Sequence, residues 1–262
     1  MFTVEQRDAL RDHVLQLAEE DERVVAGAAV GSLAVDGGGD QFSDLDLTFG
    51  IADHVPTAEV LDDWTRTLIG ERDAVHLVDL ERDPTTYRVF VLPEALQFDL
   101  SMTPAAQFRP AGPRFRLLFG ETAPDDSEVP TPRVPGNLFI PTPSVPHDLF
   151  GWGVIYALHA RACIERGRVW QAEHYLGAVR DHALSLACLR ERVTAVQARG
   201  YDDLSAETLA RFDGSHVTVV EPGALRAALA ASVLALMREG AEAQLPHADA
   251  VAQRLVELSV IR

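Results

Sequence analysis

The sequence predicts an α+β domain with a mixed sheet, followed by an all-α helical bundle. In the first half of the chain, short apolar runs alternate with amphipathic stretches, whereas the second half carries long segments of helical periodicity. Seven prolines fall within the 23 residues from Pro124 to Pro146, a composition typical of a linker. We therefore expect a mixed domain at residues 1–122, a linker at 123–146 and a helical domain at 147–262.

The first domain opens with an amphipathic helix at residues 4–19, in which apolar side chains recur at helical spacing. The expected strands cover residues 23–32, 44–51, 74–81, 87–93 and 95–103, with a weaker candidate at 114–121, and a second helix covers 57–70. Such a mixture fits α/β and α+β architectures, and α+β is the class that we assign.

The second domain is predicted to be a bundle of about five helices. The helical segments are residues 148–167, 169–193, 205–212, 223–244 and 247–261. Their apolar positions recur with the period of an α-helix, and the sequence contains no internal repeat.

The chain is acidic, with a formal net charge of −17, most of it within residues 1–122. A field of this sign repels nucleic acid and anionic membranes and favours cationic partners. A need for solubility explains the charge equally well, so charge alone does not identify the substrate.

Several features favour a soluble, cytoplasmic protein without a membrane partner. The first residues are too charged for a signal peptide, and no apolar run approaches the ~20 residues of a spanning helix. Cys163 and Cys188 lack the spacing of a metal site and lie in helical segments. We expect them to be buried thiols in a reducing compartment rather than a disulfide.

Two aspartates interrupt the apolar pattern of the strand "DLDLTFGI". Side chains two residues apart on a strand share a face, so Asp44 and Asp46 point the same way while Leu45 and Leu47 point to the core. Two converging carboxylates repel each other unless a cation lies between them, which indicates a Mg²⁺ site. An exposed edge strand is the alternative explanation for this motif when it is taken alone.

Two further features join this pair. Gly31 and Ser32 follow the first apolar strand directly, where a glycine lets the backbone approach a ligand and a hydroxyl can bind phosphate oxygens. Asp99 is a third carboxylate on the polar face of a strand, "LQFDLSM". Together, the three carboxylates and the Gly-Ser pair fit an enzyme that transfers a group from a nucleoside triphosphate, with Mg²⁺ ions at the attacking and leaving oxygens.

This arrangement resembles the nucleotidyltransferase superfamily that includes DNA polymerase beta and the antibiotic nucleotidyltransferases. The matching residues are Gly31, Ser32, Asp44, Asp46 and Asp99. The resemblance implies that Ser32 and the backbone beside it hold the triphosphate, and that the carboxylates ligate two Mg²⁺ ions. The resemblance leaves two roles for Asp99, which either shares a metal or takes the proton of the acceptor hydroxyl. The family does not fix a single general base.

The helical domain is expected to build the pocket for the acceptor. Trp170, Glu173 and His174 share one face of a helix, and an aromatic plate beside a carboxylate suits an amine-bearing sugar. Glu173 is therefore a candidate auxiliary base. Ordinary helix packing is the favoured explanation for this face, with Trp170 in the core and the Glu and Arg side chains paired within the helix. Core packing is also the favoured explanation for Trp152, Tyr156 and His159.

A mixed domain followed by a helical bundle looks like the aminoglycoside and lincosamide nucleotidyltransferases. The leading hypothesis is thus transfer of AMP from ATP to a hydroxyl of a small cationic molecule such as an aminoglycoside. A lincosamide acceptor, or a protein or RNA end as in toxin-antitoxin systems, remains open. A non-catalytic nucleotide-binding module is a third hypothesis, against which the intact set of three acids argues.

Overall fold

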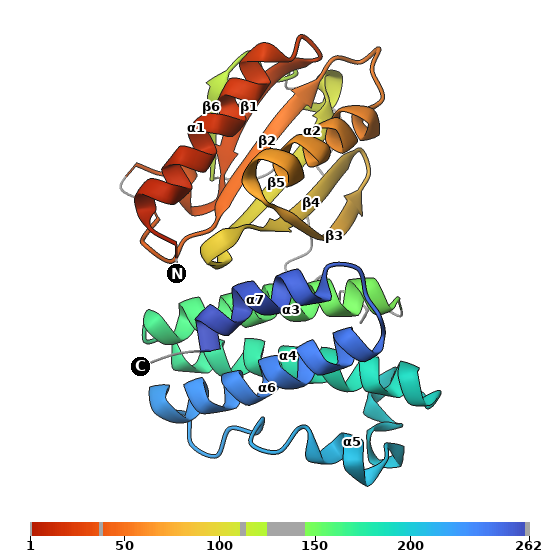
Figure 1. Cartoon of the computed structure of the whole chain (residues 1–262). Coiled ribbons are helices and arrows are strands. Elements are labelled where there is room, and N and C mark those ends of the chain that lie inside the picture. The colour runs from red at the N-terminus through yellow and green to blue at the C-terminus, as the bar shows by residue number, and fades with distance from the viewer. Residues whose placement is uncertain (1, 37–38, 111–113, 125–144, 260–262) are drawn as a thin grey trace. The chain divides into compact units, whose positions relative to one another are not determined.

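The computed structural model describes residues 2–36, 39–110, 114–124 and 145–259. The chain divides into two compact units, Phe2–Pro141 and Thr142–Arg262, which are described separately below (Figure 1). Most of the predicted linker, 123–146, lies outside the described residues, and so do the last residues of the final predicted helix. The proposed limits of the two domains stay a prediction.

The first unit is built on a six-stranded sheet with the order β3-β4-β5-β2-β1-β6. Its strands are β1 (Val24–Val30), β2 (Leu45–Ile51), β3 (Val75–Arg82), β4 (Thr85–Val91), β5 (Gln97–Pro104) and β6 (Phe115–Phe119). β2 and β5 are parallel, while the other neighbouring pairs are antiparallel. The sheet is mixed, as predicted, and the weakest strand candidate forms β6, one of its two edge strands.

Two helices cover one face of this sheet (Figure 1). In α1 (Val4–Glu20) the buried side chains Leu10, Val14 and Ala18 recur every four residues, which places them on one side of the helix. α2 (Thr57–Arg72) contributes Trp64, among others, to the same core. The alternating apolar residues of β2 and β5 point into this layer, so the polar residues between them face the other side of the sheet.

The second unit is helical, as predicted. It contains α3 (Pro146–Glu165), α4 (Val169–Glu191), the short α5 (Ala206–Ala210), α6 (Pro222–Glu242) and α7 (Ala248–Ser259) (Figure 1). α4 packs against α3 and α6, and α7 packs against α6. Cys163 and Cys188 are buried free thiols within this bundle.

In the described part of the chain, none of the helices combines the length and the apolar character needed to cross a bilayer.

Candidate active site

Asp44, Asp46 and Asp99 come together at the centre of the sheet. β2 and β5 are parallel neighbours whose register pairs Asp46 with Asp99, and Asp44 directly precedes β2. One carboxylate oxygen from each residue lies within 4.8 Å of the others, and all three residues are half-buried. These three residues, called the carboxylate triad below, have the donor type that Mg²⁺ prefers.

The triad is electrostatically costly without a cation. The pKa of Asp46 lies well above its usual value, because the side chain is desolvated and because Asp44 and Asp99 are close. Burial and the charge of Asp44 raise the pKa of Asp99 to about 7, against the opposing effect of a hydrogen bond from Gln97. A divalent cation would remove this repulsion, so the donor set fits a metal ion.

Gly31 lets the backbone pass close to the triad. It opens η1, a four-residue 3₁₀ turn (Gly31–Ala34) that follows β1, and its φ of 68° lies in the left-handed region. A Cβ at this position would lie 2.4 Å from Oδ2 of Asp46. No other residue type would fit this turn without displacing the carboxylate.

Ser32 follows Gly31 in the same turn. Its hydroxyl is buried and finds no hydrogen-bond partner among the described residues. Buried hydroxyls are normally paired, so this one is suited to bind a ligand oxygen. η1 is one 3₁₀ turn rather than the start of an α-helix, so a helix dipole does not add to binding here.

Gln97 also belongs to the site, although the sequence pattern alone assigns it no role. It is 4% exposed, and its amide donates a 2.9 Å hydrogen bond to Oδ1 of Asp99. The bond fixes one oxygen of Asp99 and leaves Oδ2 for other partners. The available signal was its position two residues before Asp99 on the same face of β5.

Glu173 lies on α4 in the second unit and is half-buried. Trp170 is 75% exposed, so the expectation that it packs into the core is wrong. Its position in the first turn of α4 places the ring where the described residues do not cover it. The role of Glu173 as an auxiliary base stays a prediction.

The aromatic residues expected in the core of the bundle form a half-buried cluster instead. The ring centroids of Tyr156 and Tyr175 are 6.0 Å apart, and those of His159 and Tyr175 are 5.1 Å apart. Trp152 packs against Tyr156 at 5.7 Å. These residues therefore contribute both to packing between α3 and α4 and to the accessible surface of the unit.

The triad, Gly31 and Ser32 form one constellation on a mixed sheet. Such an acidic triad is typical of polymerase beta-like nucleotidyltransferases. The fold and the grouping of the three acids that the resemblance implied are both present.

No family model matches the chain, and no curated protein sequence does. Among solved structures, the chain is similar to an aminoglycoside 6-adenyltransferase from Bacillus subtilis, with 13% identity and a TM-score of 0.36 over the full length of both chains. Similarity at this level defines neither family nor substrate. The interpretation of the site therefore depends on the sheet and the triad.

Proposed function

We propose that the protein transfers AMP from ATP to a hydroxyl of a small cationic molecule, such as an aminoglycoside, and releases pyrophosphate. The observation that carries the proposal is the triad, whose three carboxylate oxygens lie within 4.8 Å of one another on β2, β5 and the residue before β2. This donor set, beside a glycine turn and a buried unpaired hydroxyl, suits a metal-bound triphosphate. We place the reaction in the cytoplasm.

Asp44, Asp46 and Asp99 would hold two Mg²⁺ ions. When bound, the ions would neutralise charge on the triphosphate and on the leaving pyrophosphate. The hydroxyl of Ser32 and the backbone of η1 bind the phosphate oxygens and orient the α-phosphorus. The acceptor oxygen forms a bond to this phosphorus as the bond to pyrophosphate breaks.

The proton of the acceptor hydroxyl needs a base. Asp99 is suited to this role because its Oδ1 is fixed by Gln97 while Oδ2 is not held by that bond. Glu173 on α4 is the second candidate. Glu173→Gln distinguishes the two, because it slows transfer without weakening ATP binding if Glu173 is the base and leaves transfer unchanged if Asp99 is the base.

The charge of the chain supports a cationic acceptor. The formal net charge is −17, so protonated amines gain free energy in its field, whereas a polyanion is repelled. The exposed Trp170 ring near Glu173 on α4 offers an apolar plate beside a carboxylate, a combination that suits an amine-bearing sugar.

Pyrophosphate release with a panel of aminoglycosides, a lincosamide and no acceptor tests the proposal. We expect release that needs Mg²⁺, ATP and an aminoglycoside. Asp46→Asn should reduce the rate by at least about 10³-fold because it removes a metal ligand. Asp213→Asn makes the same change at an exposed site in the second unit and should leave the rate unchanged. Equal rates in Asp46→Asn and the wild type would refute the mechanism.

A further inference from the structure

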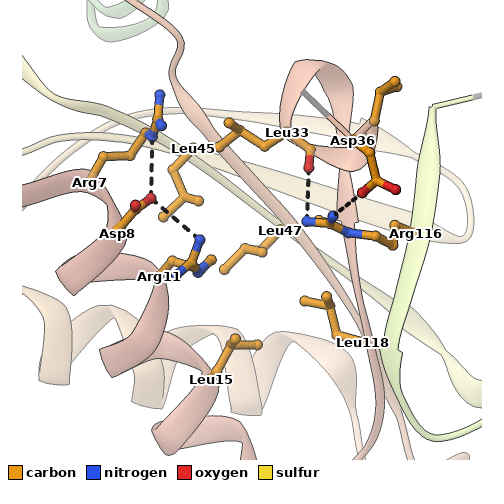
Figure 2. A pocket seen from close by; sticks show the side chains of 12 residues that line it. Arg7, Asp8, Arg11, Leu15, Leu33, Asp36, Leu45, Leu47, Arg116 and Leu118 are labelled. Carbon is orange, nitrogen blue, oxygen red and sulfur yellow. Dashed lines mark hydrogen bonds and ion pairs between the residues drawn. The ribbon is translucent and has the colours of Figure 1, made fainter. Parts of the chain in front are cut away.

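A cavity of about 380 Å³ lies in the first unit, between α1 on one side and η1 and β6 on the other (Figure 2). β2 contributes to its floor through Leu45 and Leu47. Asp46 stands between these leucines in sequence and therefore points to the opposite face of the sheet. The cavity is separate from the triad, although one strand serves both.

The rim of the cavity is basic in an acidic protein. Arg7 and Arg11 reach it from α1, and Arg116 reaches it from β6 across the opening (Figure 2). Asp8 and Asp36 accompany them, so the charged lining carries a net charge of about +1, against −17 for the whole chain. Arg11 also pairs with Asp8 and Asp12, and Arg116 pairs with Asp36. Asp12 and Asp36 are exposed, and surface ion pairs of this kind contribute little free energy, so the carboxylate of a ligand can replace them.

Arg7 is the most deeply placed of the three arginines. It is 5% exposed, and its Nη1 donates to the backbone oxygens of Asp40 and Ser43 at 2.7 and 3.2 Å. Its Nε is buried and finds no hydrogen-bond acceptor within the described residues, and Oδ1 of Asp8 is 3.8 Å away. A buried N–H without an acceptor is costly, and a ligand oxygen would satisfy it.

The floor of the cavity is apolar. It is lined by Leu15, Leu33, Leu45, Leu47 and Leu118, together with Ala29. Leu45 and Leu47 are fully buried, whereas Leu15, Leu33 and Leu118 are half-buried. An inorganic anion would pair with the arginines but would leave these three half-buried leucines in contact with water. A ligand that has both a carboxylate and an apolar chain covers both parts, and the planar guanidinium fork suits a carboxylate.

We propose that this cavity binds a small organic carboxylate with an aliphatic chain. The carboxylate lies at the arginine rim, and the chain lies over the leucines of the floor. A cavity of about 380 Å³ falls within the size range of small-molecule sites. Because the triad lies on the other face of the sheet, this ligand is distinct from any substrate of the proposed transfer.

Calorimetric titration of the full-length protein with octanoate tests the site. We expect saturable binding of one octanoate per chain. 1-Octanol and octylamine keep the chain but lack the negative charge, so they should bind at least about tenfold more weakly. Equal binding of octylamine, or equal binding of inorganic phosphate, would overturn the proposal, as would the absence of any saturable heat with octanoate.

Three variants locate the binding. Arg116→Gln and Arg11→Gln each remove one charge from the rim and should weaken octanoate about fivefold to tenfold. Arg66→Gln removes an exposed charge on α2, and its affinity should equal that of the wild type. Thermal unfolding midpoints confirm that all three are folded. Wild-type affinity in both rim variants would refute the site even if octanoate binds elsewhere.

Discussion

At the level of single residues, the absence of a side chain at Gly31 lets the backbone of η1 pass close to the carboxylate of Asp46. Gly31→Ala would bring a methyl group to 2.4 Å from Oδ2 of Asp46 and would add a strained positive φ. We expect the variant to fold with a loss of about 1–2 kcal/mol of stability, and transfer to fall at least about 10²-fold. Pyrophosphate release and thermal unfolding measure the two effects.

Gly70→Ala is the matched control. A Cβ at Gly70 on α2 meets no atom within 4 Å, and the residue is helical. This change should leave transfer unchanged and stabilise the protein by roughly 0.5–1 kcal/mol. If both variants retain wild-type transfer, η1 does not position Asp46.

Asp99 gives a prediction about pH. Its pKa is 3.8 in the unfolded chain and about 7 in the folded protein, so the folded state holds this proton more tightly. Without a metal, its contribution to stability is therefore complete below about pH 4 and is lost as the pH rises to about 7. Asp99→Asn removes the charge and should stabilise the metal-free protein at pH 8 by about 1–2 kcal/mol, and not at pH 4.

Urea unfolding in the presence of a chelator at the two pH values measures this difference. Added Mg²⁺ should stabilise the wild type more than Asp99→Asn, because the variant has lost a ligand. A variant that is less stable than the wild type at pH 8 in chelator would show that the triad carries no repulsion.

At the scale of secondary structure, α1 and the segment before β2 are joined by Arg7. Its Nη1 donates to the carbonyls of Asp40 and Ser43, and Ser43 precedes Asp44. Arg7→Gln should cost about 1–3 kcal/mol of stability, since two carbonyls lose a charged donor. It should also weaken Mg²⁺ binding severalfold because Asp44 is less well fixed.

Calorimetric titration with Mg²⁺ checks this link, with Arg66→Gln as the control for loss of charge. Unchanged Mg²⁺ affinity in an Arg7→Gln variant of reduced stability would confine Arg7 to a role in folding.

Much of this unit could be predicted from sequence because its apolar periods are local. The alternation around Asp46 and the helical spacing of Leu10, Val14 and Ala18 give strand and helix directly. The pairing of β2 with β5 joins residues about fifty positions apart, which no local pattern specifies. The nearness of Asp99 to Asp46 was therefore predictable only through the resemblance to nucleotidyltransferases.

The burial of two side chains, Arg7 and Trp170, differs from what their residue types suggest, and each difference has a physical reason. Arg7 is one of the first charged residues of a helix, a position that is usually solvated, yet it is buried because the loop before β2 offers it two carbonyls. Trp170 is the reverse case, a large apolar side chain left 75% exposed in the first turn of α4. Whether a side chain at the end of a helix is buried depends on which other segments pack against it, and the local sequence does not specify those segments.

At the scale of the whole molecule, each unit has its own core. The core of the first unit draws on α1, α2 and the sheet and lies wholly within Phe2–Pro141. We expect a fragment of residues 1–141 to fold and to bind Mg²⁺ with ATP at wild-type affinity, but to lack transfer because α4 is missing. Calorimetric titration of the fragment checks its binding of Mg²⁺ and ATP, and pyrophosphate release checks its transfer activity. A fragment with full transfer activity would exclude a role for Glu173.

We propose above all that the triad supports transfer of a nucleotide to a small cationic acceptor. Mass spectrometry of an aminoglycoside panel after incubation with ATP, Mg²⁺ and protein tests it most directly. We predict that one acceptor gains a single adenylyl group with the wild type and with Asp213→Asn, and gains none with Asp46→Asn. Acceptors of unchanged mass throughout the panel, or an equal gain with Asp46→Asn, would refute this function.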